Sequence, residues 1–443
     1  MTTRRRIAVA ALTFAVTIAV VLTLLLSSGR EPSGGPGGTA VTSPGGGGSP
    51  DRPTAPATPP TSTPPRPARP AGPPEGTVHV AERYLRSYRA VHVGWDEVLA
   101  RGRPLPPVSS RCADRWRKSG KDPRVDWPSG DFLCLDALQG RGYKPQGLAG
   151  SATTTRYPVG SRPAAQRNIL LVSAYSRQQL PGLFAPNHAG ESVTRLVVID
   201  QDQRRYNTVE LVKPDGPSRL RNLNSHGSGL AWAGQYLYSS SHSTLWMYNA
   251  DDLMEISGRF VLPAVARWKV QGPGGLSSIS LDASARPRQL VGINYSTKGQ
   301  AYVHSFDLAS DGLLRRGARG KGQGAGRAMF LENQFGADRL GPLVHSARSQ
   351  PISGTNYQGV GTRGRYTFAN SSGMRTKRSG SARVDATAVL KDGKVIDTIE
   401  MPEGNGESVF LDYRRGTYHS MVEHGGQFLF SVPIRELVST AEN

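Results

Sequence analysis

The sequence has little cysteine, few aromatic residues and no recognisable catalytic motif. Only 2 of its 443 residues are Cys, and Phe, Trp and Tyr together make up 7%. After residue 29 it contains no G-x-S-x-G elbow, Walker loop, dinucleotide fingerprint or zinc-ligand spacing, which removes the best-marked enzyme and metalloprotein classes. Long helical patterns are missing after residue 100, so helix bundles and doubly wound α/β folds are disfavoured.

Acidic residues are outnumbered by basic ones. The chain holds 54 Lys and Arg against 34 Asp and Glu, a formal net charge of +20. Much of the excess lies in residues 315–378, which we predict to form a membrane- or wall-facing patch and not a packed structural element. The first part of this segment alternates basic residues with Gly and should form a mobile loop. Such a basic loop would suit anionic wall polymers or lipid headgroups, with no specific nucleic acid; the alternative is that it only keeps the domain soluble. The basic residues of this Gly-rich loop are Arg315, Arg316, Arg319, Lys321 and Arg327.

The chain begins with a basic segment and an unbroken run of apolar residues and Thr at 7–26. At about 1.5 Å per residue this run covers the ~30 Å hydrocarbon core of a bilayer, and the preceding arginines favour a cytoplasmic N-terminus. We therefore predict that residues 1–29 are a single-pass signal anchor in the cell membrane. The alternative is a cleaved signal peptide and a secreted protein.

The anchor is followed by two segments before the main domain. Residues 30–75 are almost entirely Gly, Pro, Ser, Thr and Ala, which predicts a disordered linker. Residues 76–131 are predicted to be an extension, in which 77–100 forms one packing helix. Cys112 and Cys134 should face an oxidising exterior, so we predict a disulfide that closes a polar loop and contributes ~3 kcal/mol.

Five stretches of the remaining chain share one order of parts, which indicates internal repeats. Each opens with a pair of small or polar residues and a short apolar strand, and two further strands follow. The openings begin at 146, 228, 277, 358 and 407. Because a propeller blade takes roughly 40 to 50 residues, we predict an all-β fold with a single β-propeller at 132–443. Five blades are expected, with six as the alternative if residues 328–344 hide a degenerate blade.

The final repeat has only three clear strands, whereas residues 132–135 form an apolar run that belongs to no repeat. We therefore predict that this run supplies the fourth strand of the last blade and closes the ring, which removes an exposed sheet edge. Large aromatic residues are predicted to pack between the blades. They are Trp232, Trp246, Trp268, Phe306 and Phe410.

The openings KPQGLAG, HGSGLAW, NYQGVGT and NGESVFLD resemble the blade starts of bacterial secreted propellers with NHL repeats and of SMP-30/gluconolactonase-like proteins. The resemblance spans residues 132–437 and implies a lactonase, a lyase or a plain binding module. Lactonases of that group hold a channel metal through a Glu, an Asp and Asn side chains. Here the aligned positions supply one acid and no Asn, so no metal cofactor is predicted, with Ca²⁺ as the alternative. Those positions are Gln146, Ser228, Ser277, Gln358 and Glu407.

A channel enzyme would need Glu407 and a proton-transfer partner, for which His226 and His419 are candidates. Asp282 and Asp412, which each close a first strand, are instead interpreted as turn formers. We predict a monomeric, non-catalytic binding or scaffold module at the cell envelope, with a channel hydrolase or lyase, or a polyanion-binding wall adhesin, as alternatives. The histidines are otherwise expected in solvent-facing turns or strands; they include His226, His242, His304, His419 and His424.

Overall fold

The computed structural model describes part of the chain, all of it within one unit, Arg69–Asn443. The predicted anchor and linker lie outside the described residues. Among the residues described, no helix combines the length and apolar character needed to cross a bilayer. The described residues are 84, 86–127, 132–140, 142–154, 157–159, 162–177, 184, 192–216, 218–272, 274–297, 300–315, 329–333, 343–376, 379, 383–402, 404–424 and 427–443.

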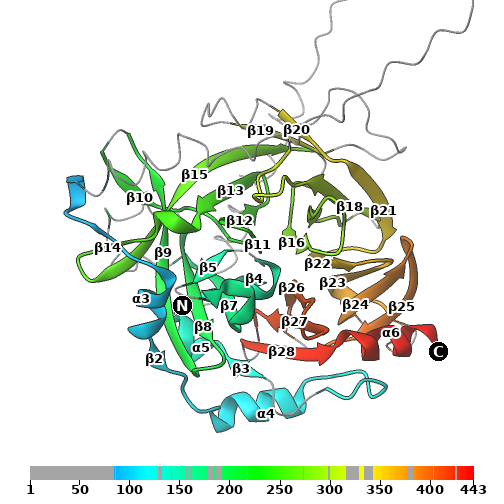
Figure 1. Ribbon diagram of the computed structural model, residues 1–443. Helices are drawn as coiled ribbons and strands as arrows, with labels where there is room; N and C mark the ends of the chain where they lie inside the picture. Colours follow the sequence, from blue (N-terminus) through cyan, green and yellow to red (C-terminus); the bar gives the residue numbers. More distant parts are fainter. Residues whose placement is uncertain are drawn as a thin grey trace, which may run out of the picture. The chain divides into compact units, whose positions relative to one another are not determined.

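The strands pair into four-stranded blades that surround a common centre (Figure 1). Within the described residues there are five such blades, in chain order. From the centre outward, their strands are β4 (Lys144–Gly150), β7 (Ile169–Ser176), β8 (Val193–Asp200) and β9 (Arg205–Pro214); β11 (Gly229–Ala233), β12 (Tyr236–Ser241), β13 (Thr244–Asn249) and β15 (Arg259–Gln271); β16 (Ser278–Asp282), β17 (Gln289–Ile293), β18 (Gln300–Asp307) and β21 (Arg348–Ser353); β22 (Tyr357–Arg363), β23 (Tyr366–Met374), β24 (Val384–Lys391) and β25 (Lys394–Glu400); and β26 (Gly406–Asp412), β27 (Thr417–Val422), β28 (Phe428–Pro433) and β3 (Leu133–Cys134).

The innermost strands form a closed ring. Each of β4, β11, β16, β22 and β26 contacts the next, and β26 contacts β4 again (Figure 1). The predicted all-β propeller is therefore confirmed. The number of blades in the whole chain stays a prediction, but β19 (Phe330–Asn333) and β20 (Leu343–His345) pair onto the outer edge of β15. The described part of the region suggested for a sixth blade thus extends the second blade.

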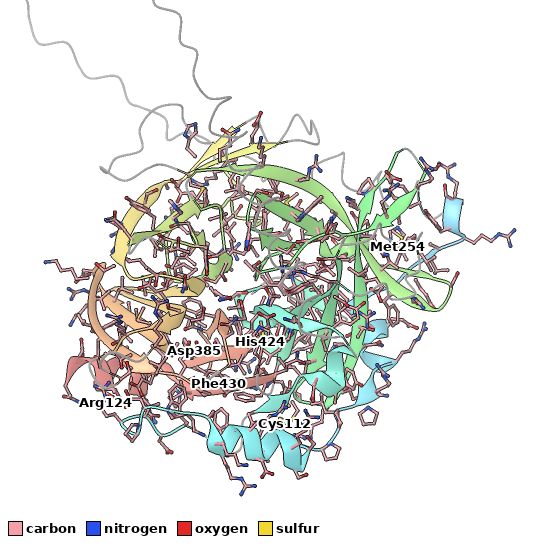
Figure 2. The ribbon with its side chains drawn as sticks, turned by 180° about the vertical axis from the view of Figure 1, so that it is seen from behind. Cys112, Arg124, Met254, Asp385, His424 and Phe430 are labelled. Atoms are coloured by element: carbon pink, nitrogen blue, oxygen red, sulfur yellow. A yellow bond between two sulfur atoms is a disulfide. The ribbon has the colours of Figure 1, made fainter. Side chains whose placement is uncertain are left out.

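Ring closure follows the prediction. In the last blade Cys134 lies opposite Phe428 and Leu133 opposite Leu429, so a strand from the N-terminal side completes the sheet. Cys112 and Cys134 form the predicted disulfide, with Cα atoms 6.2 Å apart. Cys112 lies at the outer edge of the ring, on a segment that runs past the last blade (Figure 2). The crosslink therefore ties the N-terminal extension to the closing strand.

The segment between the two cysteines is not simply a loop, because it begins with α4 (Ser110–Lys118). Ser109 caps this helix by accepting from the Cys112 amide at 3.3 Å. Cys112 and Trp116, four residues apart, share its buried face. Trp116 stacks on Phe132 with ring centroids 5.2 Å apart. The polar composition of the segment concealed this helix, because only two of its residues enter the core.

The single helix predicted for 77–100 is also wrong. Its described residues hold a short helical turn, then β1 (Val91–His92), then α3 (Trp95–Ala100). Arg89 takes a positive φ of 49°, which interrupts a helix, and Val91 is 63% exposed instead of packed. α3 does pack on the propeller, since the Trp95 ring lies 5.2 Å from that of Trp232.

Glycines at the blade openings let the innermost strands approach each other. A Cβ on Gly229 would lie 2.2 Å from the backbone nitrogen of Ile279, and one on Gly147 would lie 2.9 Å from the Gly229 carbonyl carbon. Only hydrogen fits at these contacts. The predicted inter-blade aromatic residues are confirmed as buried, at most 5% exposed.

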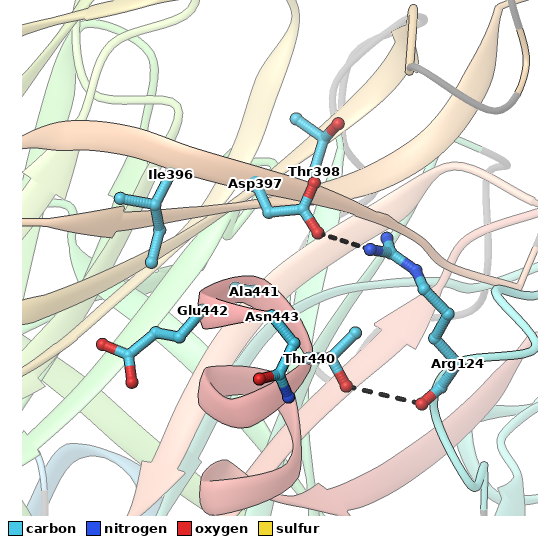
Figure 3. Close-up of a pocket in the computed structure, with 8 residues that line it drawn as sticks. All are labelled: Arg124, Ile396, Asp397, Thr398, Thr440, Ala441, Glu442 and Asn443. Atoms are coloured by element: carbon cyan, nitrogen blue, oxygen red, sulfur yellow. Dashed lines mark hydrogen bonds and ion pairs between the residues drawn. The ribbon is translucent and has the colours of Figure 1, made fainter.

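A C-terminal helix, α6 (Ile434–Glu442), covers the outer side of the fourth and fifth blades (Figure 1). A hollow of about 360 Å³ lies beside its end, and Figure 3 shows the residues that line it. There Arg124 pairs with Asp397 at 2.9 Å, and its carbonyl accepts from Thr440 at 3.4 Å. These polar groups bind one another across the hollow, so we interpret them as a structural attachment of the helix.

Candidate functional site

Three of the five blades open with a β-bulge at the same end of the ring. The register shifts at Gln146 in β4, at Gln358 in β22 and at Ser408 in β26. A bulge adds one unpaired residue and re-aims a side chain. These bulges turn the polar residues at the starts of the innermost strands toward one another, and we call this end of the ring the mouth.

Glu407 is the centre of the mouth cluster. It is 1% exposed and hydrogen-bonded to the side chains of Gln146 and Glu423. With its amide nitrogen facing Glu407, Gln358 donates to both carboxyl oxygens, at 3.0 Å for Oε2, and accepts from Ser372 Oγ at 2.9 Å. Three of the predicted channel positions, from the first, fourth and fifth blades, therefore meet here.

The other two channel positions have a different role. Ser277 Oγ lies within hydrogen-bond distance of the Ile293 carbonyl at 2.9 Å and of the Tyr357 carbonyl at 2.8 Å, the latter in the next blade. Ser228 is 5% exposed, and its amide donates to the Ser240 carbonyl at 2.7 Å. Neither serine precedes a bulge, so their hydrogen bonds brace strands and do not extend the Glu407 cluster.

The paired carboxyls of Glu407 and Glu423 ionise differently. Burial, followed by the charge of Glu423, raises the pKa of Glu407 well above its usual value, so this carboxyl keeps its proton to a higher pH than an exposed glutamate does. Burial opposes ionisation of Glu423 as well, but hydrogen bonds from Lys144 and Glu407 and the charge of His424 leave its pKa below the usual value. In the pH range between these two pKa values, the pair holds one acid and one carboxylate joined by a hydrogen bond.

Lys144 and His424 lie beside Glu423 at the edge of the mouth. Lys144 Nζ lies 2.9 Å from Glu423, and His424 Nε2 lies 3.4 Å from it. Asp385 accepts from the backbone amides of Gly404 and Asn405, both at 2.7 Å, which fixes the turn that leads into β26. Asp385 and His424 lie toward the middle of the ring (Figure 2).

Aromatic side chains form a second part of the mouth. The His226 ring packs edge-on against Tyr175 at 4.2 Å and stacks on His242 at 5.7 Å. Arg177 lies 3.3 Å from His226 Nε2. Burial, followed by the charges of His242 and Arg177, lowers the pKa of His226 to about 4, so its imidazole is neutral at pH 7. This aromatic group was not predicted, because Tyr175 comes from strand β7 of the first blade and the two histidines come from loops of the second.

The structure does not bring His419 to Glu407. His419 lies opposite Phe410, farther along the strands, and stacks on that ring at 5.5 Å. It is 5% exposed and His304 is 1% exposed, so the expectation of solvent-facing positions is wrong for both. Burial lowers the pKa of each to about 4. Their flanking apolar residues place them in blade interiors, where a neutral imidazole is accommodated.

The aspartates that close first strands are turn formers, as predicted. Asp282 Oδ1 accepts from the amides of Ser284 and Ala285 at 2.8 and 3.1 Å. Asp412 Oδ1 accepts from the amides of Arg414 and Arg415, both at 2.9 Å. Their carboxyls are therefore occupied by the backbone of the turns.

The basic segment 315–378 is not one loop. Arg315 is described, whereas Arg316, Arg319, Lys321 and Arg327 lie outside the described residues. Beyond Met329 the segment contributes β19 to β23, including strands of the third and fourth blades, so the prediction that it avoids packed structure is wrong there. Gly repeats mark the first part, but the strand pattern resumes after them.

No group of three or more His, Cys, Asp or Glu side chains in the described part of the chain could hold a metal ion. The expectation of no metal cofactor, with Ca²⁺ as the alternative, stays a prediction. No family model matches the sequence, and no curated protein matches it. Among solved structures, the chain is similar to the β-propeller domain of Cps50 (Swd1) from Myceliophteria thermophila, with 9% identity, a TM-score of 0.27, and coverage of 66% of this chain and 97% of that one. That match adds nothing to the strand pairing described above.

Proposed function

We propose that the protein is a membrane-anchored binding module that takes its ligand at the mouth of an extracytoplasmic propeller. The observation that carries this proposal is the convergence of Gln146, Gln358 and Glu407 from three blades. A bulge lies at each of the two glutamines and directly after Glu407. Residues 7–26 would anchor the chain and 30–75 would hold the propeller away from the membrane. The likeness of the blade openings to NHL and SMP-30-like propellers, which include binding modules, agrees with this function.

The mouth favours a polar and largely uncharged ligand. Gln358 is only partly buried, and the aromatic group of Tyr175, His226 and His242 offers ring faces beside it. Neutral hydrogen-bonding groups next to aromatic rings suit a ligand with hydroxyl and amide groups on an apolar ring framework. A glycan segment of the cell envelope has this chemistry.

The test is binding of soluble cell-wall glycan fragments to the full-length protein in non-ionic detergent, measured by calorimetry. We expect His226→Ala to weaken binding at least ~10-fold, because a lost aromatic contact in a desolvated site is worth more than 1 kcal/mol. The matched control is His92→Ala, an exposed histidine on β1, which should leave the affinity unchanged. Absence of binding by the unaltered protein, or equal losses in both variants, would overturn the proposal.

A second candidate is a hydrolase, and the hydrogen-bonded acid and carboxylate of Glu407 and Glu423 favour it. Such a pair can donate a proton to a leaving group and accept one from water. The same fragments, incubated with the protein and analysed by mass spectrometry, separate the two functions. Cleavage that disappears in Glu423→Gln while binding persists would establish the enzyme, and intact fragments after long incubation would rule it out.

A further inference from the structure

An arginine-rich hollow of about 870 Å³ lies at the opposite end of the innermost strands from the mouth. It is formed by the turn between β22 and β23, the turn between β26 and β27, and the start of α6. Four arginines line it, and none of its lining residues is acidic. These four are Arg363, Arg365, Arg415 and Arg435, and we call the cavity that they line the arginine hollow.

Two of these arginines are oriented by acids. Arg365 forms a two-pronged pair with Asp392, with Nε 3.0 Å from both carboxylate oxygens. Arg415 lies 3.6 Å from Asp202. Neither acid lines the hollow. These contacts hold the guanidinium groups in place while two further arginines carry uncompensated charge.

Arg363 and Arg435 have no acidic partner among the described residues. Arg363 lies over the Tyr413 ring, 5.8 Å from its centroid, and Arg435 is exposed in the first turn of α6. The Tyr413 hydroxyl is bonded to the Thr362 carbonyl and lies 3.2 Å from Asp282. Arg363 is thus placed on a ring that is itself fixed to the two preceding blades.

The start of α6 contributes Arg435 to the hollow, whereas Glu436 in the same turn does not line it and accepts from the Asp126 amide. Its N-cap, Pro433, makes no side-chain capping hydrogen bond, and the first-turn amides carry the partial positive charge of the helix dipole. Gly364 and Gly416, which also line the hollow, both have positive φ, at 60° and 68°. They keep the two arginine-bearing turns tight and leave their backbones open to a ligand.

We propose that the arginine hollow binds a soluble polymer of closely spaced phosphate groups. Guanidinium groups match phosphate oxygens in bidentate geometry, and a hollow of about 870 Å³ exceeds the size of one phosphate. This site is separate from the mouth, because β26 runs from Glu407 to Asp412 between them, roughly 15 Å at the rise of an extended strand. Its occupation is therefore independent of the ligand proposed for the mouth.

The experiment titrates the full-length protein in non-ionic detergent with short-chain inorganic polyphosphate at several salt concentrations. Arg363→Gln/Arg435→Gln should weaken binding at least ~10-fold, because both substitutions remove charge-assisted hydrogen bonds to phosphate. The slope of log affinity against log salt should also become shallower by about two. Arg111→Gln/Arg219→Gln removes the same net charge from exposed arginines elsewhere and should change the affinity less than ~3-fold.

A second pair of substitutions tests whether a loss of binding comes from misfolding. Arg363→Lys/Arg435→Lys keeps the charge and removes the bidentate fork, so affinity should fall to an intermediate value. Equal losses in the hollow and control variants would show non-specific attraction and overturn the proposal. So would unchanged affinity in the Lys variant. Binding to vesicles with anionic phospholipids, lost in the Gln variant while polyphosphate does not bind, would replace the polymer with a membrane surface.

Discussion

The two ends of the innermost strands use polar residues in opposite ways. At the mouth, Glu407, Gln146 and Gln358 are tied to one another, and the charges of Glu423 and Lys144 are paired. At the arginine hollow, by contrast, the turns carry guanidinium groups of which two have no acidic partner among the described residues. Polar groups at the mouth should therefore influence stability and its pH dependence. Those of the hollow should influence binding alone.

The largest effect is expected where the innermost strands touch. Gly229→Val places a branched side chain whose Cβ alone would lie 2.2 Å from the Ile279 nitrogen. Because the obstacle is backbone, the strands must separate, and we expect a loss of more than ~3 kcal/mol in the free energy of unfolding. Chemical denaturation measures it. Gly94→Ala is the control, since nothing lies closer than 3.9 Å to its added Cβ; similar losses in both would contradict the close-approach interpretation.

The carboxyl pair at the mouth should give two variants with opposite pH dependence. The folded pKa of Glu423 is lowered, so its contribution is present above the unfolded pKa and disappears as the pH falls. Glu423→Gln should therefore cost about 1 to 3 kcal/mol at pH 7 and less in acid. The folded pKa of Glu407 is raised, so its ionisation weakens the fold as the pH rises above the unfolded pKa.

Glu407→Gln removes that weakening and keeps a side chain that can donate to Glu423. The difference between the melting temperature of this variant and that of the unaltered protein should grow in favour of the variant as the pH rises from 4.5 to 8. The unfolded pKa of about 4.5 sets the lower limit of this range. Parallel pH profiles for the two variants would contradict the assignment of one acid and one carboxylate.

His419 lies between the two ends and should have a smaller effect. Its folded pKa is lowered to about 4 from 6.5, so the neutral side chain supports the fold above pH 6.5 and loses that support as the pH falls toward 4. His419→Phe keeps a ring stacked on Phe410 and removes the titration. Relative to the unaltered protein, its unfolding free energy should be higher by about 2 kcal/mol at pH 5 than at pH 7.5. A difference that does not vary with pH would contradict this.

The smallest effect is expected at the arginine hollow. Arg363→Gln/Arg435→Gln changes side chains that lack acidic partners among the described residues, so the free energy of unfolding should move by no more than about 0.5 kcal/mol. Thermal unfolding followed by circular dichroism measures it. A drop of several degrees would mean that the hollow is part of the structural framework and would erase the contrast with the mouth.

The repeats could be predicted from the sequence because each strand is a short apolar run that follows a recurring opening pair. The predicted openings at 146, 228, 277, 358 and 407 lie at or next to the starts of β4, β11, β16, β22 and β26, the innermost strands of the five blades described. The closing strand was also predictable, since counting strands left one missing. The outer strand β15 was not, because it pairs in parallel with β9 at one end and antiparallel with β13 at the other. That arrangement depends on contacts between blades.

The candidate site was predictable only in part. Alignment of the blade openings brought Gln146, Gln358 and Glu407 together correctly. It missed Glu423, which follows β27 and reaches the mouth because the second strand of a blade returns there. The bulges that separate these residues from Ser228 and Ser277 depend on strand register, which a single sequence does not specify. Arg363 and Arg435, 72 positions apart in the chain, become neighbours only when α6 folds back.

The pairing of β3 with β28 imposes an order on folding. Synthesis proceeds from the N-terminus, so the closing strand is made early and must wait for its partner, almost 300 residues later. Contacts this distant along the chain form slowly. The Cys112–Cys134 bond spans only 22 residues, so it can form while the rest is still being made. Once that bond has formed, the closing strand is joined to α4 before the last blade is complete.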